Sequence, residues 1–379
     1  MHLTPFFMSS KNTITVLYMP GRERSYARTS IFIIGMKKIG INLIDCSSQN
    51  KSNIRYLEVL FKFFKNKNRA DIILVGFLGQ HLMPIVKLFA KKNQKIIFDA
   101  FLSTYDTMVF DKKKVKESSY LAKLFWWLDK KSSMLADVVL LDTFQHINYF
   151  SETFNISKSK FRRVLIGADD TFFYPKKTTE IIESTTDNKN IQKNNKFIVE
   201  FHGYFIPLQG VEYIIRTAKI LQNEKDILFK LIGDGQTFEY CKKLANDLNL
   251  HNVLFLGKQP YHQIPSYIAE CDIGLGIFGS SMKTQRVIPN KAYEIIAMNK
   301  PLITADTLAT AELFEHKKHA YLCKPKDPAS IANAILLLKN DKILRNKIAN
   351  NGYSLFKEKC STETIGTELK KIIERLSHS

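Results

Sequence analysis

The sequence of 379 residues is poor in cysteine and has no long hydrophobic run. Its five cysteines are dispersed, without a CxxC pair or a histidine at zinc-ligand spacing, so we expect reduced thiols that fill a core rather than disulfides or a zinc site. No apolar run approaches the roughly 20 residues that a membrane-spanning helix needs. The first residues lack the basic and apolar regions of an export signal, and we therefore expect a cytoplasmic protein.

Acidic residues are also scarce, because 36 Asp and Glu stand against 56 Lys and Arg, which gives a formal net charge of +20. Such a charge suits a nucleic-acid partner, an anionic membrane or a lysine-rich composition with no specific partner. The sequence contains no RNP-like, zinc-finger or helix-turn-helix signature, and its basic residues are spread along the chain. We therefore expect no nucleic-acid partner and keep a basic nucleic-acid-binding protein as an alternative function.

Two basic stretches carry large aromatic rings, residues 56–69 and residues 112–131. Aromatic rings amid lysines suit the interface of an anionic membrane leaflet, although packing in a core explains many such rings equally well. The first explanation would place the protein peripherally on the inner face of a membrane.

Short apolar runs alternate with helical patterns through the first half of the chain. Residues 13–19 form a β-branched run that ends at a Pro-Gly pair, and later apolar runs lie at 41–44, 71–75, 95–98 and 138–141. Buried strands that alternate with helices predict a parallel sheet covered on both faces. The same order restarts at residues 197–201, where a predicted strand runs into a glycine turn.

The polar composition of residues 176–196 marks a boundary between two such units, because a segment with almost no large apolar side chain cannot join a core. We expect an α/β fold of two Rossmann-like, doubly wound domains that face a cleft. The predicted parts are an N-terminal domain over 1–175, a polar linker over 176–196, a second domain over 197–350, and C-terminal helices over 351–379 that pack toward the domain junction.

The stretch 286–304 is the most informative candidate for a binding site. Pro289 disfavours helical geometry in the residue before it, so a helix is predicted to begin near Asn290, a good N-cap. The free N–H groups of that helix start, its dipole and the full charge of Lys291 would favour an anion. Glu294 follows about one turn later, where a carboxylate can accept both hydroxyls of a ribose; a solvated surface glutamate is the alternative.

Six motifs follow one another in the second half of the chain. They are a glycine turn with Pro-Leu-Gln-Gly-Val-Glu up to residue 212, Phe-Lys-Leu-Ile-Gly-Asp-Gly up to 235, Phe-Leu-Gly up to 257, Ala-Glu-Cys-Asp-Ile-Gly up to 274, the segment 289–301, and Pro-Lys-Asp-Pro-Ala-Ser-Ile-Ala from 325. In this order they resemble the donor domain of GT-B glycosyltransferases of the retaining family 4, or glycosyltransferase group 1. The resemblance covers most of residues 197–340, whereas the first half is similar only in outline.

The resemblance implies transfer of a sugar from a nucleotide-sugar to a glycan or lipid-linked acceptor, with retention of the anomeric configuration. The second domain would bind the donor and the first domain the acceptor. It also implies no cofactor and no catalytic metal, because backbone amides, a helix terminus and cationic side chains stabilise the leaving diphosphate. The sequence has no DxD-like metal motif, and the Asp169-Asp170 pair in a turn is more simply explained as structural.

Donor-binding roles follow from the resemblance at matching positions. Glu294 matches the ribose-binding glutamate, and Gly203 matches the glycine that lets the backbone approach the phosphates. Three positions depart from the family, because Arg286 replaces a glutamate that contacts the sugar, and Tyr204 and Gln209 replace diphosphate-binding cations. Either nearby cations compensate, or the chain is a catalytically silent GT-B protein. The predicted donor-binding residues are Gly203, Gln209, Gly210, Lys283, Arg286, Asn290, Lys291 and Glu294.

The first domain offers candidates at the ends of its predicted strands. Gly21 and Arg22 follow the first strand and are assigned to the acceptor or phosphate side, with a solvated arginine as the alternative. His81, Asp99 and Asp106 are the candidate catalytic residues, and a structural role at a helix start is the alternative for His81. The family often has a histidine near the last two positions, which this chain lacks, so no catalytic base is named.

Overall fold

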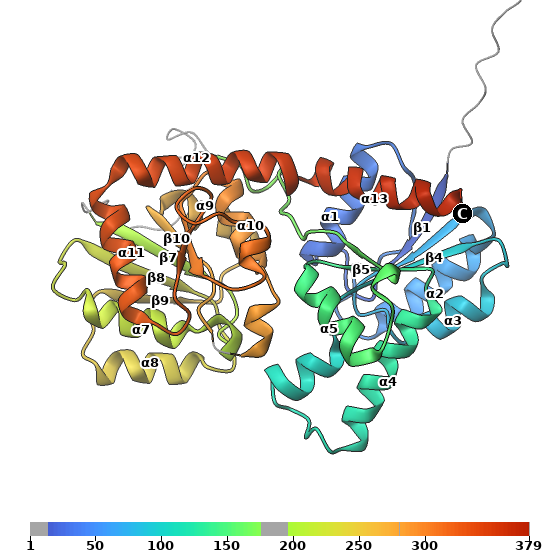
Figure 1. The fold of residues 1–379 in the computed structure, drawn as a ribbon, viewed down its shortest axis with the longest axis horizontal. Coiled ribbons are helices and arrows are strands. Elements are labelled where there is room, and N and C mark those ends of the chain that lie inside the picture. Colours follow the sequence, from blue (N-terminus) through green and yellow to red (C-terminus); the bar gives the residue numbers. More distant parts are fainter. Residues whose placement is uncertain (1–13, 176–195, 280, 379) are drawn as a thin grey trace, which may run out of the picture.

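The computed structural model describes residues 14–175, 196–279 and 281–378. Two predictions concern residues outside these ranges. They are the absence of an export signal, which was argued from the first residues, and the polar linker, of which residues 176–195 are not described. The described chain forms two six-stranded parallel sheets with flanking helices (Figure 1). The predicted α/β fold of two doubly wound units is therefore confirmed.

The first sheet is built from β1 (Thr15–Met19), β2 (Asn42–Asp45), β3 (Ile72–Val75), β4 (Lys95–Phe101), β5 (Val138–Leu141) and β6 (Phe161–Arg163). Its helices are α1 (Ala27–Lys38), α2 (Ile54–Asn66), α3 (Met83–Phe89), α4 (Tyr120–Leu135) and α5 (Phe144–Phe154). The strand order is β2-β1-β3-β4-β5-β6. Because the chain moves outward from β1 in both directions, α1 packs on one face of the sheet and α2 to α5 pack on the other.

The second sheet is built from β7 (Phe197–His202), β8 (Ile227–Ile232), β9 (Val253–Gly257), β10 (Ile273–Leu275), β11 (Leu302–Ala305) and β12 (Tyr321–Cys323). Its helices are α7 (Val211–Ile220), α8 (Phe238–Asp247), α9 (Ile264–Glu270), α10 (Asn290–Ala297) and α11 (Pro328–Asn340). The strand order is β12-β11-β10-β7-β8-β9, so the direction of winding reverses between β7 and β10. Ligands of doubly wound sheets bind outside the carboxyl ends of the strands at such a reversal.

Two C-terminal helices link the sheets along one side of the molecule (Figure 1). The first, α12 (Lys342–Lys359), packs against α10 and α11, and the second, α13 (Thr362–Ser377), packs against α1. The crossing of α1 and α13 is close, because a Cβ on Gly366 would lie only 2.3 Å from the carbonyl oxygen of Gly35. The last helix thus fastens the end of the chain to the first sheet rather than to the second.

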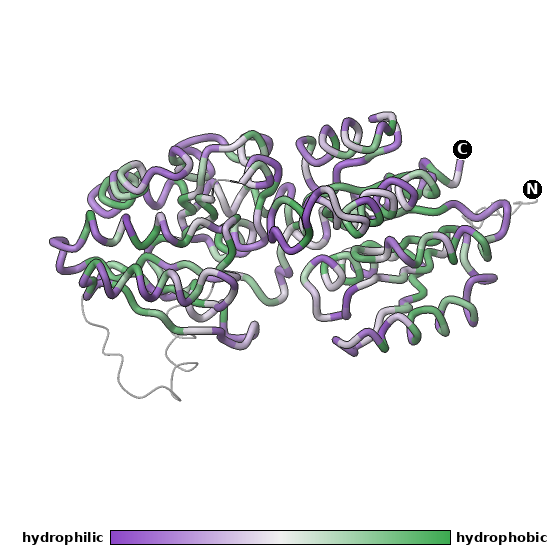
Figure 2. The backbone as a smooth tube through the Cα atoms, turned by 90° about the horizontal axis from the view of Figure 1, so that it is seen from below, coloured by the Kyte–Doolittle hydropathy of each residue, from purple (hydrophilic) through white to green (hydrophobic). Residues whose placement is uncertain are grey.

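Apolar side chains form continuous cores on both faces of the sheets. One core cluster extends from α1 and the first sheet through α10, α12 and α13 into the second, so the two units share buried contacts. Figure 2 shows hydrophilic and hydrophobic residues alternating along the outer helices, as amphipathic packing requires. All five cysteines are free and buried, which confirms their predicted role as core residues. Within the described ranges, no helix is both long enough and apolar enough to cross a bilayer.

Candidate functional site

Loops that leave the carboxyl ends of both sheets meet between the two domains. The hydroxyl of Thr143, after β5, donates a hydrogen bond of 2.7 Å to the carbonyl oxygen of Arg286. The carboxylate of Glu312, after β11, accepts from the backbone N–H groups of Phe144 (2.8 Å) and Gln145 (2.9 Å). A side chain of the second domain therefore caps the first turn of α5, where a carboxylate also complements the helix dipole.

The predicted donor cations Arg286 and Lys283 are engaged with carboxylates of the first domain. Arg286 donates from Nη2 to Asp106 Oδ1 at 2.6 Å, and its guanidinium carbon lies 4.2 Å from the centre of the Tyr149 ring. Lys283 Nζ lies 3.2 Å from Asp111 Oδ2, and both side chains are almost fully buried. Neither cation points freely toward a donor, and Asp106, one of the predicted catalytic residues, is the ion-pair partner of Arg286.

The carboxylate of Glu294 lies at the centre of a buried hydrogen-bond network at the end of β7. Its Oε2 lies 2.8 Å from His202 Nε2, and its Oε1 accepts a hydrogen bond of 2.9 Å from the hydroxyl of Tyr261. The other ring nitrogen of His202 lies 2.9 Å from Glu200 Oε1. Glu294 is therefore not the solvated surface glutamate of the alternative interpretation; its side chain is only 6% exposed.

The charge of this network is set by two carboxylates on one imidazole. Burial alone would lower the pKa of His202, but Glu200 and Glu294 outweigh burial and raise it to about 9. Burial and then the charge of Glu294 raise the pKa of Tyr261, so its hydroxyl stays protonated and donates. At neutral pH an imidazolium thus bridges two carboxylates, and Glu294 is held in one orientation.

Lys291 projects from the first turn of α10 toward the glycine turn after β7. Its Nζ donates to Gln209 Oε1 at 2.6 Å and lies 3.4 Å from the centre of the Phe201 ring. Burial lowers the pKa of Lys291 well below its ordinary value, against the opposing effect of Glu200 and Glu294. Burial therefore opposes the charge predicted for this side chain, and among the described residues no carboxylate bonds to its ammonium group.

Glycines surround the same point and let backbone segments approach closely. A Cβ on Gly203 would lie 2.8 Å from Lys291 Nζ, and a Cβ on Gly233 would lie 1.8 Å from the carbonyl oxygen of Gly203. Gly210 has a φ of +67° and leads into α7. Only glycine fits the contact at position 233, so the close pairing of these two turns depends on residue type.

The start of α10 differs from the prediction by one residue. The helix begins at Asn290 itself, and Pro289, with extended backbone angles of −71° and 151°, occupies the N-cap position without a side-chain cap. The predicted N-cap role of Asn290 is thus wrong, because the fixed φ of proline already supplies the extended residue that precedes the helix. The first N–H groups of the helix consequently have no side-chain partner from the cap residue.

Asp99 is a buried structural residue, which corrects its assignment as catalytic. Both of its carboxylate oxygens accept from Arg28, at 2.7 Å from Nη2 and 2.8 Å from Nε, and both side chains are at most 1% exposed. The guanidinium of Arg28 also stacks against Phe32 and Phe101. A carboxylate enclosed in this way cannot touch a substrate, and it instead ties α1 to β4.

The remaining first-domain candidates lie in the segments that follow β1 and β3. The N–H of Gly21 donates to the carbonyl oxygen of Phe77 at 3.0 Å, and a Cβ on Gly21 would lie 2.2 Å from the backbone of residue 78. Arg22 pairs with its neighbour Glu23 at 3.1 Å. The His81 ring packs edge-on against an aromatic ring of α2, and partial burial followed by the charge of a nearby arginine lowers its pKa.

Sequence reasoning missed several members of the site. His202 directly precedes the glycine turn, but nothing in the local sequence marks it as a site residue, and Tyr261 lies in a segment without a motif. Asp129 on α4 accepts from Ser103 Oγ (2.7 Å) and Tyr105 N–H (2.9 Å), and it thereby fixes the loop after β4. Burial raises its pKa to about 6 despite these hydrogen bonds. Pairs such as these are far apart in sequence and become neighbours only in the fold.

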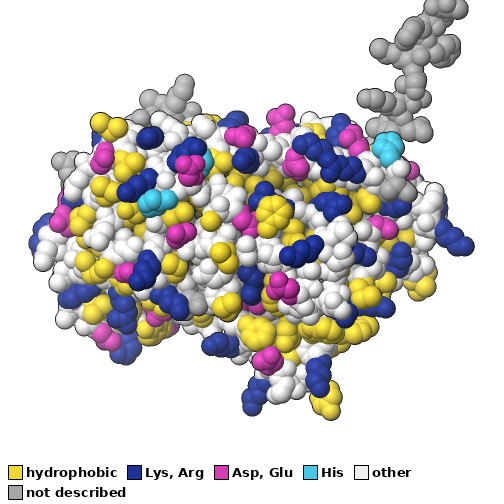
Figure 3. All heavy atoms as spheres, viewed as in Figure 1, with side chains coloured by type: hydrophobic (Ala, Val, Ile, Leu, Met, Phe, Trp, Pro, Cys, Tyr) yellow, Lys and Arg dark blue, Asp and Glu magenta, His cyan; other side chains and the backbone are white. Residues whose placement is uncertain are grey.

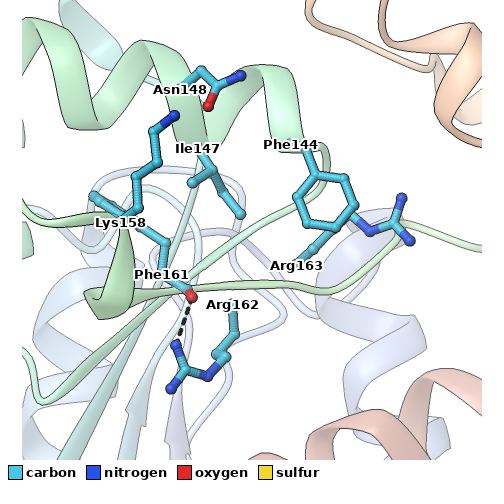
Figure 4. A pocket seen from close by; sticks show the side chains of 7 residues that line it. All are labelled: Phe144, Ile147, Asn148, Lys158, Phe161, Arg162 and Arg163. Atoms are coloured by element: carbon cyan, nitrogen blue, oxygen red, sulfur yellow. Dashed lines mark hydrogen bonds between the residues drawn. The ribbon is translucent and has the colours of Figure 1, made fainter.

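An open pocket of about 520 Å³ lies elsewhere, along α5 and β6 at the outer edge of the first sheet (Figure 4). The ring of Phe144 stacks with Arg163 there, at 4.3 Å from the guanidinium carbon. The pocket is lined by Phe144, Ile147, Asn148, Lys158, Phe161, Arg162 and Arg163, none of which is a predicted donor residue. In the described parts of the chain, no group of three or more His, Cys, Asp or Glu side chains could hold a metal ion.

Solved structures share this architecture over nearly the whole chain. HepE of Anabaena, in complex with UDP-glucose, superposes with a TM-score of 0.72 at 14% identity and covers 96% of this chain and 100% of its own. Sucrose-phosphate synthase of Thermosynechococcus elongatus superposes with a TM-score of 0.70 at 14% identity, covering 96% of this chain and 99% of its own. The chain has the GT-B fold.

Sequence comparisons find relatives of this GT-B protein over part or most of its length. Residues 183–355 match the family model described as glycosyl transferases group 1. An uncharacterised glycosyltransferase of Methanocaldococcus jannaschii (MJ1178) is 27% identical over 47% of this chain. The match spans 48%, or about half, of that relative's length. A second one from that organism (MJ1069) is 24% identical over 86% of this chain and 80% of its own length.

Proposed function

We propose that this GT-B protein is a glycosyltransferase that moves a sugar from a nucleoside-diphosphate sugar to a glycan or lipid-linked acceptor. The observation that carries the proposal is the placement of Lys291 and Glu294 on one helix, beside the glycine turn of Gly203, where the winding of the second sheet reverses. An anionic diphosphate and a ribose are the ligand groups that this combination suits. The group 1 family match over residues 183–355 supports the same conclusion.

Lys291 would supply the cation that the resemblance places at residue 209. Gln209 stands at that position, and its amide oxygen receives the ammonium group of Lys291 at 2.6 Å. A bound diphosphate would favour the charged form of the lysine and would thus oppose the effect of burial on its pKa. Glu294, fixed by His202 and Tyr261, would accept the ribose hydroxyls through the second lone pairs of its two oxygens.

The transfer itself would proceed with retention and without a resident metal. The bond from the anomeric carbon to the diphosphate oxygen breaks, and a bond from the same face to the acceptor oxygen forms. The proton of the acceptor hydroxyl passes to the departing diphosphate oxygen, so no protein base is consumed. The backbone N–H groups at the start of α10 and the protonated Lys291 would stabilise the charge that develops on the diphosphate.

The donor is tested by calorimetric titration with UDP, UDP-glucose and the corresponding GDP and dTDP compounds. UDP is the first choice because HepE of Anabaena was solved with UDP and with UDP-glucose. Lys291→Met should weaken nucleotide binding at least about ten-fold, or about 1.4 kcal/mol, because the diphosphate loses its cation. Lys243→Met, which changes a lysine with a 75% exposed side chain in the same domain, is the matched control.

Two results would contradict the proposed donor site: no nucleotide binds the wild-type protein, or Lys291→Met binds UDP as tightly as the control does. Transfer is then tested by incubation with the bound nucleotide-sugar and glycan or lipid-linked acceptors. Nuclear magnetic resonance of the product reports its anomeric configuration, and an inverted product would refute retention. Activity that disappears with a chelator and returns with a divalent ion would refute metal independence.

A catalytically silent GT-B protein is the second candidate. It is favoured by Arg286 and Lys283, which are committed to Asp106 and Asp111 of the first domain instead of facing a donor. Such a protein would bind nucleotide without transferring or hydrolysing sugar. Variant Arg286→Ala separates the two candidates, because an active enzyme should change in kcat or donor affinity when the contact between its domains is cut, whereas a silent protein has no turnover to lose.

A further inference from the structure

The outer face of α2 is apolar although it is turned to solvent. Ile54, Leu57, Phe61 and Phe64 recur at intervals of three or four residues, and they are 56%, 69%, 71% and 43% exposed. The opposite side of the same helix buries Val59 completely in the core. A surface helix of a globular protein normally has one apolar stripe, facing the core, so the second stripe needs its own explanation.

The exposed stripe continues onto the neighbouring helix. At the end of α3, Leu88 is 76% exposed and Phe89 is 43% exposed, and the Phe89 ring packs edge-on against Phe64 with 5.0 Å between ring centres. We call Ile54, Leu57, Phe61, Phe64, Leu88 and Phe89 the α2–α3 stripe. Both helices lie at the right of Figure 1, on the face of the first sheet opposite α1.

Exposed cations lie on the same elements as the α2–α3 stripe. Lys65, Arg69, Lys87, Lys91 and Lys92 are all exposed and lie on α2, on α3 or in the segments that follow them. The two carboxylates of this region are engaged: Glu58 accepts from the hydroxyl of Ser48, and Asp71 accepts from the N–H of Thr15. Figure 3 shows hydrophobic and basic side chains next to one another on the face of the first domain that is turned to the viewer.

We propose that the α2–α3 stripe docks the first domain on an anionic lipid surface. Apolar side chains at the acyl boundary and lysines at the headgroups are the arrangement that such a surface binds. A second copy of this chain is a poorer occupant, because the exposed cations of the two copies would face each other in a protein of net charge +20.

The α4 helix extends the same surface. It packs against α3, and Tyr120, Leu124 and Trp127 on its outer side are 90%, 48% and 48% exposed. Lys123 lies 5.7 Å from the centre of the Tyr120 ring. Exposed rings beside ammonium groups recur at headgroup level, because such rings have an apolar body and a polar edge.

The stripe begins close to the carboxyl end of β1. Arg55, in the first turn of α2, donates from Nε to the carbonyl oxygen of Gly21 at 2.8 Å, and the neighbouring Tyr56 packs against His81. Resting on the proposed function, this position would bring a lipid-linked acceptor from the membrane to the acceptor side of the first domain. Lipid docking itself needs no donor and no transfer, so it can be measured separately.

The test is flotation with vesicles of phosphatidylcholine alone or of phosphatidylcholine mixed with phosphatidylglycerol, without nucleotide, at low and high salt. Wild-type protein should float with the mixed vesicles at low salt, and binding should fall with salt. Leu57→Glu/Phe61→Glu should lose at least about ten-fold in binding, because two charges would enter the acyl boundary. Ile220→Glu/Ile343→Glu, at exposed positions of the second domain, carries the same added charge and should bind like wild type.

Three outcomes would overturn lipid docking: no binding of wild type to mixed vesicles at low salt, equal loss in both double variants, or dissociation of a wild-type oligomer by Leu57→Glu/Phe61→Glu with vesicle binding unchanged. The last result would assign the stripe to a contact between copies. Because all four altered positions are exposed, circular dichroism melts should agree among the proteins. UDP titration of the same samples separates a failure of lipid docking from a failure of the proposed donor site.

Discussion

Replacing His202 by glutamine removes the cation that separates two buried carboxylates. Glu200 and Glu294 are 0% and 6% exposed in their side chains, and each contributes one oxygen to the imidazole. The pKa of His202 rises from 6.5 to about 9, which corresponds to about 3 kcal/mol of preference for the protonated ring in the folded protein. Loss of the ring leaves two carboxylates in a buried site with one uncharged donor between them.

The sign of the pH dependence follows from the raised pKa. The stabilisation by His202 is fully present below about pH 6.5, where the ring is charged in both the folded and the unfolded chain, and it is lost as the pH rises through about 9. Urea unfolding of wild type and His202→Gln from about pH 6 to about pH 10 should show a difference of about 3 kcal/mol at the lower end that shrinks toward the upper end.

Two further proteins make this experiment decisive. Glu200→Gln/His202→Gln should recover part of the lost stability, because it removes the buried carboxylate that His202→Gln leaves without a cation. His251→Gln changes an exposed histidine of the same domain and should leave unfolding unaffected. A difference between wild type and His202→Gln that stays constant with pH, or a variant more stable than wild type, would refute an imidazolium between the two carboxylates. UDP affinity should fall in parallel, because Glu294 loses its fixed orientation.

Three other substitutions test separate parts of the structure. Gly233→Ala should lower the free energy of unfolding by about 2 kcal/mol or more and weaken UDP binding, because the new Cβ would lie 1.8 Å from the carbonyl oxygen of Gly203. Urea unfolding measures the stability and calorimetric titration the UDP affinity, and a variant unchanged in both would contradict the close contact. Asp99→Asn should lower the free energy of unfolding in urea by about 3 to 5 kcal/mol, because it leaves Arg28 buried without its counter-ion. Activity per folded molecule should stay normal, and a loss of activity at normal stability would instead indicate a catalytic role. Glu312→Gln should cost about 1 kcal/mol through the weakened cap of α5, and no change in the melting temperature would argue against that cap.

The fold was largely predictable because parallel strands are buried on both faces and therefore appear as short, continuous apolar runs. The runs at 41–44, 71–75, 95–98 and 138–141 coincide with β2 to β5. The glycine turn at Gly203 and the helix that starts at Asn290 were also visible, because glycine and proline restrict the backbone locally. Features of this kind depend on neighbours in the sequence, and the sequence alone is enough to place them.

The candidate site was predictable only as a set of positions. Lys283 and Arg286 were identified as cations near a donor, yet their carboxylate partners, Asp111 and Asp106, lie more than a hundred residues earlier in the chain. The pKa of His202 is raised by two carboxylates that lie on either side of its ring in space. Asp99 is buried in an ion pair with Arg28, which argues against a catalytic role. Pairings of distant residues set these charges, and no local pattern contains them.

The sequence by itself determined the two α/β units, the buried position of the cysteines, and the helix after Pro289 that carries Lys291 and Glu294. Each of these features rests on local backbone preference or on the pattern of apolar residues. Only the tertiary structure decided which polar groups pair and which apolar face is left uncovered. Both faces of α2 carry large apolar side chains, and packing against the sheet hides one of them and leaves Leu57 and Phe61 in solvent. Burial and ion pairing depend on which segments meet, and that is fixed by the packing of the whole chain.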